Sequence, residues 1–224
     1  MTKILLYGEG PHEIGYKEWS PRKKRHVTTD GWLQPMATRL RASTGSVEAR
    51  PLHSLISLPG NNQKTAHLSA LGKKALLALT VAESSKFAAV VFATDADTVH
   101  PREQAAKVAE IEAGFQTYTG AVAGIAAVPM GMSEAWLLAD PDAWTAIGAT
   151  AHAKLPKRPE ASWGAKDDPE SGRPKHVFAA MCEANDIDDH AGTRRDIAEQ
   201  ANFDTVAQRC PISFAPFRAA LAAI

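Results

Sequence analysis

The chain has 224 residues with equal numbers of basic and acidic ones, 25 of each, so its formal net charge is zero. Hydrophobic residues make up 45% of it and charged residues 22%, an ordinary globular composition that excludes a disordered or collagen-like chain. Zero net charge argues against a protein that coats nucleic acid by bulk electrostatic attraction, but a local basic surface is compatible with it. The two cysteines, Cys182 and Cys210, are too few for a disulfide framework or a four-cysteine zinc site, which favours a reducing compartment.

No segment has the pattern of an export signal or a membrane span. The apolar run 4–7 is too short for the core of a signal peptide and ends at Gly8-Glu9-Gly10. The apolar stretch 121–132 contains two glycines and a proline, and it is shorter than the roughly 20 residues that cross a bilayer. We therefore expect a soluble, cytoplasmic protein.

Residues 1–150 predict alternating strands and helices. Apolar runs that end at Gly, Pro or Asp predict strands over residues 3–8, 46–58, 86–94 and 121–129. Helical spacing and prolines at helix starts predict helices over residues 11–18, 33–42, 64–84, 102–115, 133–138 and 141–147. The basic segment 20–26 is expected to be a loop. This alternation predicts an α/β fold in which a mostly parallel sheet is flanked by helices.

The composition changes after Thr150. Residues 154–174 hold four prolines among many charges, which predicts a long polar loop. Helices are expected to follow over residues 175–185, 193–201 and 212–224. The sequence is therefore divided into an α/β catalytic domain over 1–150 and a region over 151–224, in which the polar loop and a C-terminal helical appendage pack on the sheet.

Acidic residues stand where the predicted strands end. Glu9 follows the first strand, Asp95 and Asp97 follow the third, and Glu134 comes shortly after the fourth. Because ligands of open α/β sheets bind at the carboxyl ends of the strands, we expect these carboxylates to meet. Such a cluster is unfavourable unless a cation neutralises it or one member takes up a proton. Hard oxygen ligands select Mg²⁺ or Mn²⁺, and such ions activate water in phosphodiester cleavage.

The spacing of Asp95 and Asp97 fits a shared ion, since side chains two residues apart point to the same side of an extended backbone. Each acid also has a structural interpretation. An Asp-x-Asp pair is common at helix caps and solvated turns, and Glu13 and Glu134 could serve as first-turn helix acids. Asp140, directly before Pro141, is typical of a helix N-cap.

Basic residues are the second candidate component. Arg22, Lys23, Lys24 and Arg25 could steer a phosphate backbone toward the acids, or could form a solvated loop. Lys175 could neutralise charge in a transition state, or could be an exposed lysine at a helix start. The apolar residues of the 136–138 segment, and the aromatic residues at 214 and 217, are expected in the core, and both cysteines are expected to be structural.

The acidic motifs resemble those of the TOPRIM domain, which occurs in topoisomerases, primases and the overcoming-lysogenization-defect nucleases. The likeness lies in Glu9-Gly10 after a strand, with Glu13 close behind as in the nuclease version, and in Asp95-Ala96-Asp97 after a later strand. More specifically, the chain resembles, over nearly its whole length, the bacterial TOPRIM-like family called domain of unknown function four-two-seven-six. The motifs of that closer resemblance also include Val128-Pro129, Ser133-Glu134-Ala135-Trp136-Leu137-Leu138-Ala139-Asp140, Arg173-Pro174-Lys175 and Cys210-Pro211-Ile212-Ser213-Phe214.

The resemblance implies a Mg²⁺- or Mn²⁺-dependent phosphoryl-transfer centre on Glu9, Asp95 and Asp97, with Glu13 and Glu134 as additional ligands. It also implies a role in bacterial defence or mobile-element biology, often beside an ATPase. The chain has no Gly-x-x-x-x-Gly-Lys-Ser/Thr loop, so that ATPase would be a separate protein.

The preferred hypothesis is a metal-dependent nuclease that hydrolyses phosphodiester bonds in DNA or RNA. The alternative is a non-catalytic TOPRIM-like sensor that binds nucleic acid or a partner ATPase. A third interpretation, a small-molecule phosphohydrolase, would require a closed pocket instead of an open basic groove. The sequence leaves the oligomeric state open.

Overall fold

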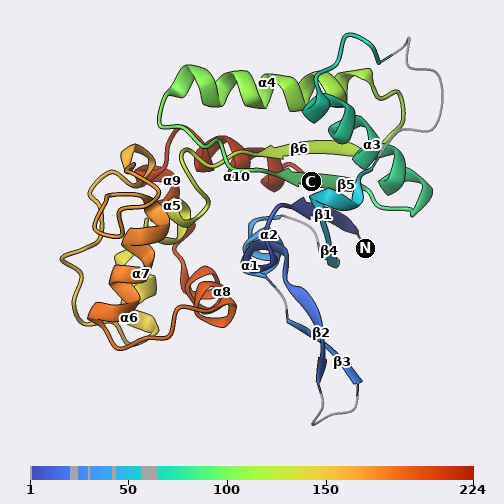
Figure 1. The fold of residues 1–224 in the computed structure, drawn as a ribbon. Coiled ribbons are helices and arrows are strands. Elements are labelled where there is room, and N and C mark those ends of the chain that lie inside the picture. Colours follow the sequence, from blue (N-terminus) through green and yellow to red (C-terminus); the bar gives the residue numbers. More distant parts are fainter. Residues whose placement is uncertain (1, 21–24, 30, 42–43, 57–64) are drawn as a thin grey trace.

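A four-stranded, all-parallel sheet forms the centre of the molecule (Figure 1). The computed structural model describes residues 2–20, 25–29, 31–41, 44–56 and 65–224, and for 16–20 and 25–29 it gives only the course of the backbone. The strands lie in the order β4-β1-β5-β6, with bounds Val47–Pro51, Ile4–Gly8, Ala89–Ala93 and Ala123–Ala127. This arrangement confirms the predicted α/β class with a parallel sheet and is consistent with a Rossmann-like fold.

Alternating side chains of the central strands build two hydrophobic layers. Leu5 and Val90 face helices α3 (Ala70–Ser84) and α4 (Pro101–Thr117), which cover the upper face of the sheet in Figure 1. Leu6 and Val91 face the opposite side and pack against α2 (Leu33–Leu40) and α10 (Phe214–Ala222). Both faces of the sheet are therefore buried, as parallel sheets require.

Residues beyond β6 form short helices on the side of the sheet away from the N-terminus (Figure 1). Their bounds are α5 Glu134–Leu137, α6 Pro141–Ala146, a 3-10 turn at Pro159–Ala161, α7 Pro174–Ala184, α8 Ala191–Gln200 and α9 Phe203–Arg209. Phe178 and Leu221 belong to the same hydrophobic cluster as Ile4 and Leu6 of β1. The C-terminal helices thus share a core with the sheet.

Trp136 of α5 is the centre of that shared core, as the sequence predicted for the 136–138 segment. Its ring stacks on Phe217 at a centroid distance of 5.2 Å and meets Phe214 edge-on at 5.1 Å. Its Nε1–H donates a hydrogen bond to the Ser213 hydroxyl at 2.8 Å. The motif over residues 133–140 therefore contributes mainly to packing, apart from Glu134.

The predicted helix over 11–18 is wrong in its second half. Helix α1 spans only Pro11–Ile14, and the chain then forms an antiparallel hairpin of β2 (Tyr16–Ser20) and β3 (Arg25–Thr29) that extends away from the body (Figure 1). Gly15 ends the helix with φ at +80°, a conformation that glycine adopts without steric cost. The predicted basic loop 20–26 is therefore partly strand.

The other predicted elements exist with shifted bounds. The predicted strand 46–58 is strand only to Pro51, and a 3-10 turn at Leu52–Ser54 follows it. Helix α9 was not predicted, although Asn202 caps it by accepting hydrogen bonds from the N–H groups of residues 204 and 205. Asp140 is the predicted N-cap, since its side chain accepts from the Asp142 N–H at 3.1 Å.

Two predictions from composition can also be compared with the fold. Cys182 and Cys210 are both buried and free, and burial raises the pKa of the Cys182 thiol to about 12, so neither is an activated nucleophile. Within the described part of the chain, no helix combines the length and apolar character needed to span a membrane.

A candidate metal site at the carboxyl ends of the strands

The strand order reverses between β1 and β5, and the candidate site lies at that point. The chain leaves β1 toward β4 on one side and leaves β5 toward β6 on the other, so the loops diverge above the carboxyl ends of β1 and β5. Ligands of open α/β sheets bind in the crevice that such a divergence leaves. Glu9 follows β1, and Thr94 and Asp95 follow β5. The Thr94 hydroxyl donates a hydrogen bond to Glu9 Oε1 and so joins the two strand ends.

The loop after β5 is held against the loop after β6 by backbone hydrogen bonds. The Ala96 N–H donates to the Pro129 carbonyl at 3.0 Å, and the Asp97 N–H donates to the Gly131 carbonyl at 2.9 Å. Asp97 has φ at +56°, so the extended geometry expected for the Asp-x-Asp pair does not hold there. Its side chain is 62% exposed, whereas Asp95 is half-buried. The two aspartates therefore meet different surroundings.

Asp95 lies at the centre of these acids and has a strongly raised pKa. Its Oδ1 accepts a hydrogen bond from the Ser133 N–H at 2.8 Å. Burial raises the pKa of this carboxyl to about 9, and four neighbouring carboxylates act in the same direction. They are, in order of decreasing effect, Glu13, Glu134, Glu9 and Asp97. The structure thus brings the other four acids singled out in the sequence within electrostatic range of Asp95.

Glu13 has the first of the two roles considered for it, that of a helix-start acid. It lies at the third position of α1, where its Oε2 accepts hydrogen bonds from the N–H groups of Glu9 at 3.1 Å and Gly10 at 3.2 Å. This is the geometry of a capping acid, and it fixes the turn that carries Glu9. Burial, with a further contribution from Glu134, also raises the pKa of Glu13, which is 8% exposed. Glu13 is therefore a structural acid that adds to the negative field at Asp95.

Two basic residues that the sequence analysis did not single out contact the acids. Lys107 of α4 donates to the Asp95 carbonyl oxygen at 2.5 Å, and its Nζ lies 3.8 Å from Asp97 Oδ2. Arg194 of α8 is 3% exposed, with Nη2 3.8 Å from Glu134 Oε1. Arg194 also forms an ion pair with Asp189. Lys107 was detectable as a cation on the helix after Asp97, but nothing in the sequence connects Arg194 to residues 60 positions earlier.

Lys175 lies near this site but on its exposed rim. It occupies the second position of α7 and, together with burial and Arg194, lowers the pKa of His12. His12 follows Glu9 by three residues, and the charge of Glu134 acts on its pKa in the opposite direction. Positive charge from Lys107, Lys175 and the buried Arg194 therefore lies near the acids.

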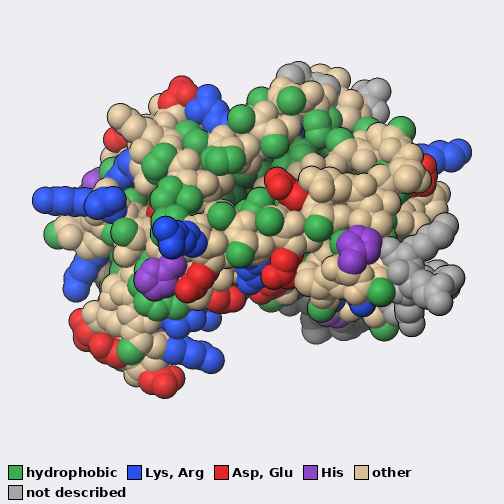
Figure 2. Space-filling model, turned by 90° about the horizontal axis from the view of Figure 1, so that it is seen from above, with side chains coloured by type: hydrophobic (Ala, Val, Ile, Leu, Met, Phe, Trp, Pro, Cys, Tyr) green, Lys and Arg blue, Asp and Glu red, His purple; other side chains and the backbone are tan. Residues whose placement is uncertain are grey.

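The basic segment of the β2–β3 hairpin cannot be compared with the site. Arg22, Lys23 and Lys24 lie outside the described residues, and Arg25 is described only as backbone at the start of β3. On the face seen in Figure 2, acidic and basic side chains of the described residues are interspersed, without a continuous field of either sign. If this face binds an anionic polymer, the attraction must therefore come from a local group of basic side chains.

The acid cluster has the donor chemistry of a hard-cation site. All its members offer carboxylate oxygens, and Glu134 Oε2 is buried without a hydrogen-bond partner among the described residues. Across the described ranges, no three His, Cys, Asp or Glu side chains are already arranged around one ion position. Mg²⁺ usually keeps several waters and takes only one or two carboxylates directly, so an open cluster still fits such an ion. Glu9, Asp95, Asp97 and Glu134 are the residues that would hold it.

Comparison of the chain with known protein families, with characterised proteins and with solved structures finds no match.

Proposed function

We propose that this protein is a TOPRIM-like, metal-dependent nuclease that hydrolyses phosphodiester bonds in DNA or RNA. The observation that carries the proposal is the raised pKa of Asp95, a desolvated carboxyl surrounded by four other acids at the topological switch point of a parallel sheet. Packing and stability do not require such an arrangement, and perturbed groups of this kind concentrate at functional sites. A divalent cation is the partner that would relieve the repulsion.

The residues of the site have distinct roles in this proposal. A bound Mg²⁺ or Mn²⁺ would supply Lewis acidity for phosphoryl transfer. Glu9, Asp95 and Asp97 hold the ion with Glu134, while Glu13 fixes the Glu9 turn through its two backbone hydrogen bonds. Lys107 and Lys175 lie where positive charge would offset the charge of a phosphate.

The exposure of the acids favours a polymeric substrate over a small molecule. Asp97 and Glu9 both reach the surface, and the cavities that Glu9 lines are open to solvent and do not include Asp95, Asp97 or Glu134. A long strand can cross such an open site, whereas a small phosphate ester would be surrounded by water. A role in bacterial defence beside a separate ATPase is part of the proposal and is supported by the motif resemblance alone.

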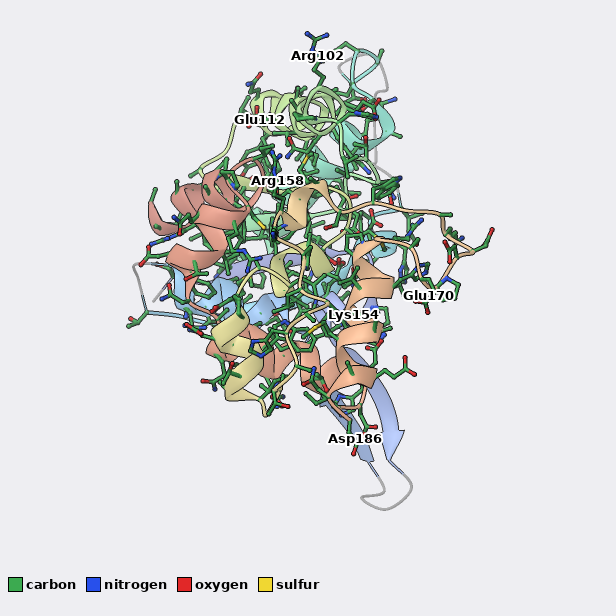
Figure 3. All side chains as sticks on the ribbon, turned by 90° about the vertical axis from the view of Figure 1, so that its left-hand side faces the viewer. Arg102, Glu112, Lys154, Arg158, Glu170 and Asp186 are labelled. Atoms are coloured by element: carbon green, nitrogen blue, oxygen red, sulfur yellow. The ribbon has the colours of Figure 1, made fainter. Side chains whose placement is uncertain are left out.

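A cleavage assay tests the proposal. The purified protein is incubated with labelled single- and double-stranded DNA and with tRNA, in Mg²⁺, in Mn²⁺ or in EDTA. We expect cleavage that requires the metal and is lost in Glu9→Gln and Asp95→Asn, but not in Glu170→Gln, whose side chain lies at the outer edge of the molecule (Figure 3). If the metal changes nothing, and all variants bind nucleic acid like the unchanged protein, the non-catalytic binding module replaces the nuclease.

A further inference from the structure

A cavity with basic walls lies beside the acid cluster. It has a volume of about 310 Å³, near the lower end of the range for ligand sites. Its lining includes Val99, Pro101 and Met130. Three basic residues, Lys157, Arg158 and Arg209, also line it, and we call this cavity the basic pocket. None of these three belongs to the acid cluster or to any motif interpreted above.

The basic pocket and the acid cluster share two loops. Val99 follows Asp97 by two residues, and Met130 precedes Glu134 by four. The loops are tied together between the two sites, because the Asp97 N–H donates to the Gly131 carbonyl and the Gly131 N–H donates to the Thr98 carbonyl at 2.7 Å. A ligand that occupies the pocket is therefore held at a fixed position relative to the acids.

Arg209 is preorganised in the wall of the pocket. Its Nη1 donates to the Ala139 carbonyl at 2.8 Å and its Nη2 donates to the Pro156 carbonyl at 2.5 Å, so its guanidinium is fixed while its charge is not neutralised. Lys157 and Arg158 are exposed, and neither side chain makes a hydrogen bond or ion pair with any residue that the structure describes. These two cations are available to a ligand.

The single acid that lines the pocket, Glu160, offsets only part of this charge. Glu160 is 5% exposed, and its oxygens accept hydrogen bonds from the N–H groups of Ile212 at 2.9 Å and Ser213 at 2.7 Å, and from the Ser213 hydroxyl. Both oxygens are thus used inside the protein. Helix α4, which has 17 residues, begins at Pro101 in the lining of the pocket and adds the positive end of its dipole.

We propose that the basic pocket binds a phosphodiester group of the nucleic-acid strand next to the one that the acid cluster hydrolyses. This inference rests on the proposed function and assigns the contact that places the strand. The pocket offers an anionic group three cations and a helix N-terminus. Its fixed connection to the acids would position that group. Contacts of this kind position a strand without reading its sequence, so the pocket contributes to affinity for any sequence.

The test is equilibrium binding of a short fluorescent single strand in EDTA, where no cleavage occurs, at several salt concentrations. The variant is Lys157→Ala with Arg158→Ala; Arg209 is left intact because its hydrogen bonds support the fold. The matched control is Arg102→Ala with Lys154→Ala, which removes the same charge from exposed residues that do not line the basic pocket. In Figure 3, Arg102 points away from the body of the molecule, and Lys154 lies apart from Arg158.

We expect the pocket variant to bind the strand about tenfold more weakly than the unchanged protein, with the slope of log affinity against log salt reduced by about 0.7 for each lost phosphate contact. The control should bind within about twofold of the unchanged protein. Equal losses in both variants, or none in the pocket variant, would overturn the inference. The inference would also be overturned if inorganic phosphate weakened strand binding equally in the unchanged protein and in the pocket variant.

The outcomes separate this inference from the proposed function. If the pocket variant loses affinity for the strand but the unchanged protein never cleaves with metal, the pocket is still a binding site and the proposed nuclease activity is wrong. If the unchanged protein cleaves with metal and the pocket variant binds and cleaves normally, the proposed nuclease activity holds and the inference about the pocket is wrong.

Discussion

Two desolvated carboxylates of this protein lie in opposite surroundings. Glu160 receives three hydrogen bonds from residues at the start of α10, and the Ser213 hydroxyl that donates one of them accepts another from Trp136. Asp95 receives one hydrogen bond from the described residues, the Ser133 N–H, and has four acids as neighbours. Glu160 is therefore satisfied by the fold, whereas Asp95 is not.

The difference separates a structural acid from a functional one. A buried charge that is fully hydrogen-bonded connects elements and stabilises them, as Glu160 does between the polar loop and α10. A cluster of like charges costs stability, and folding alone gives no reason to assemble it. We therefore expect substitutions at the two positions to have opposite effects.

Activity should show the largest difference between the two acids. Asp95→Asn removes a charged ligand without changing the shape of the side chain, so we expect metal-dependent cleavage to fall by about a thousandfold or more. Glu160→Gln, measured per folded molecule and at saturating strand, should retain the activity of the unchanged protein within about threefold, because Glu160 lines the basic pocket and does not contact the acid cluster. The measurement is the initial cleavage rate under saturating metal. Similar losses in both variants would contradict the separation.

Stability should show the reverse order. Glu160→Ala leaves two backbone N–H groups and a hydroxyl without their acceptor in a buried place, so we expect a loss of about 3 kcal/mol in the free energy of unfolding. Asp95→Asn in EDTA should be as stable as the unchanged protein or more stable, since asparagine avoids the cost of protonating Asp95 when the chain folds at neutral pH. Urea unfolding followed by circular dichroism measures both. A destabilised Asp95→Asn protein would mean that Asp95 is a structural acid.

The pH dependence of stability should follow from the raised pKa of Asp95. In the unfolded chain this carboxyl loses its proton near pH 4, but in the folded protein it does so near pH 9. Between these values the folded state binds more protons, so the free energy of unfolding falls as pH rises, by up to about 1.4 kcal/mol per pH unit. Urea unfolding in EDTA across this range should show the decline, and Asp95→Asn should reduce its slope. Equal slopes in the two proteins would show that Asp95 titrates normally.

The smallest expected effect concerns the group that orients Glu9. Thr94→Val removes the hydroxyl that donates to Glu9 Oε1 and keeps the volume of the side chain. Loss of such an outer contact typically weakens metal binding about tenfold. Thr94→Ser is the matched control, because it keeps the hydroxyl and should retain the affinity. The measurement is the Mn²⁺ affinity of each variant. Equal affinities in all three proteins would show that Thr94 does not support metal binding.

Much of the fold and the acids of the site could be predicted from local patterns. Apolar runs that stop at Glu9 and Asp95 mark strand ends, and the parallel topology then brings those ends together. The contacts of Arg194 with Glu134 and of Glu160 with Ser213 join residues more than 50 positions apart, so no local pattern could reveal them. The left-handed backbone of Asp97 depends on hydrogen bonds to the loop after β6 and was equally hidden.

The most direct measurement is calorimetric titration of the metal-free protein with Mn²⁺ at neutral pH. The unchanged protein should bind Mn²⁺ saturably, Asp95→Asn should bind it at least about tenfold more weakly, and Glu170→Gln should bind it like the unchanged protein. This result would establish that the acids around Asp95 form a cation site. Absence of saturable binding in the unchanged protein, or equal binding in the Asp95→Asn variant, would contradict the account.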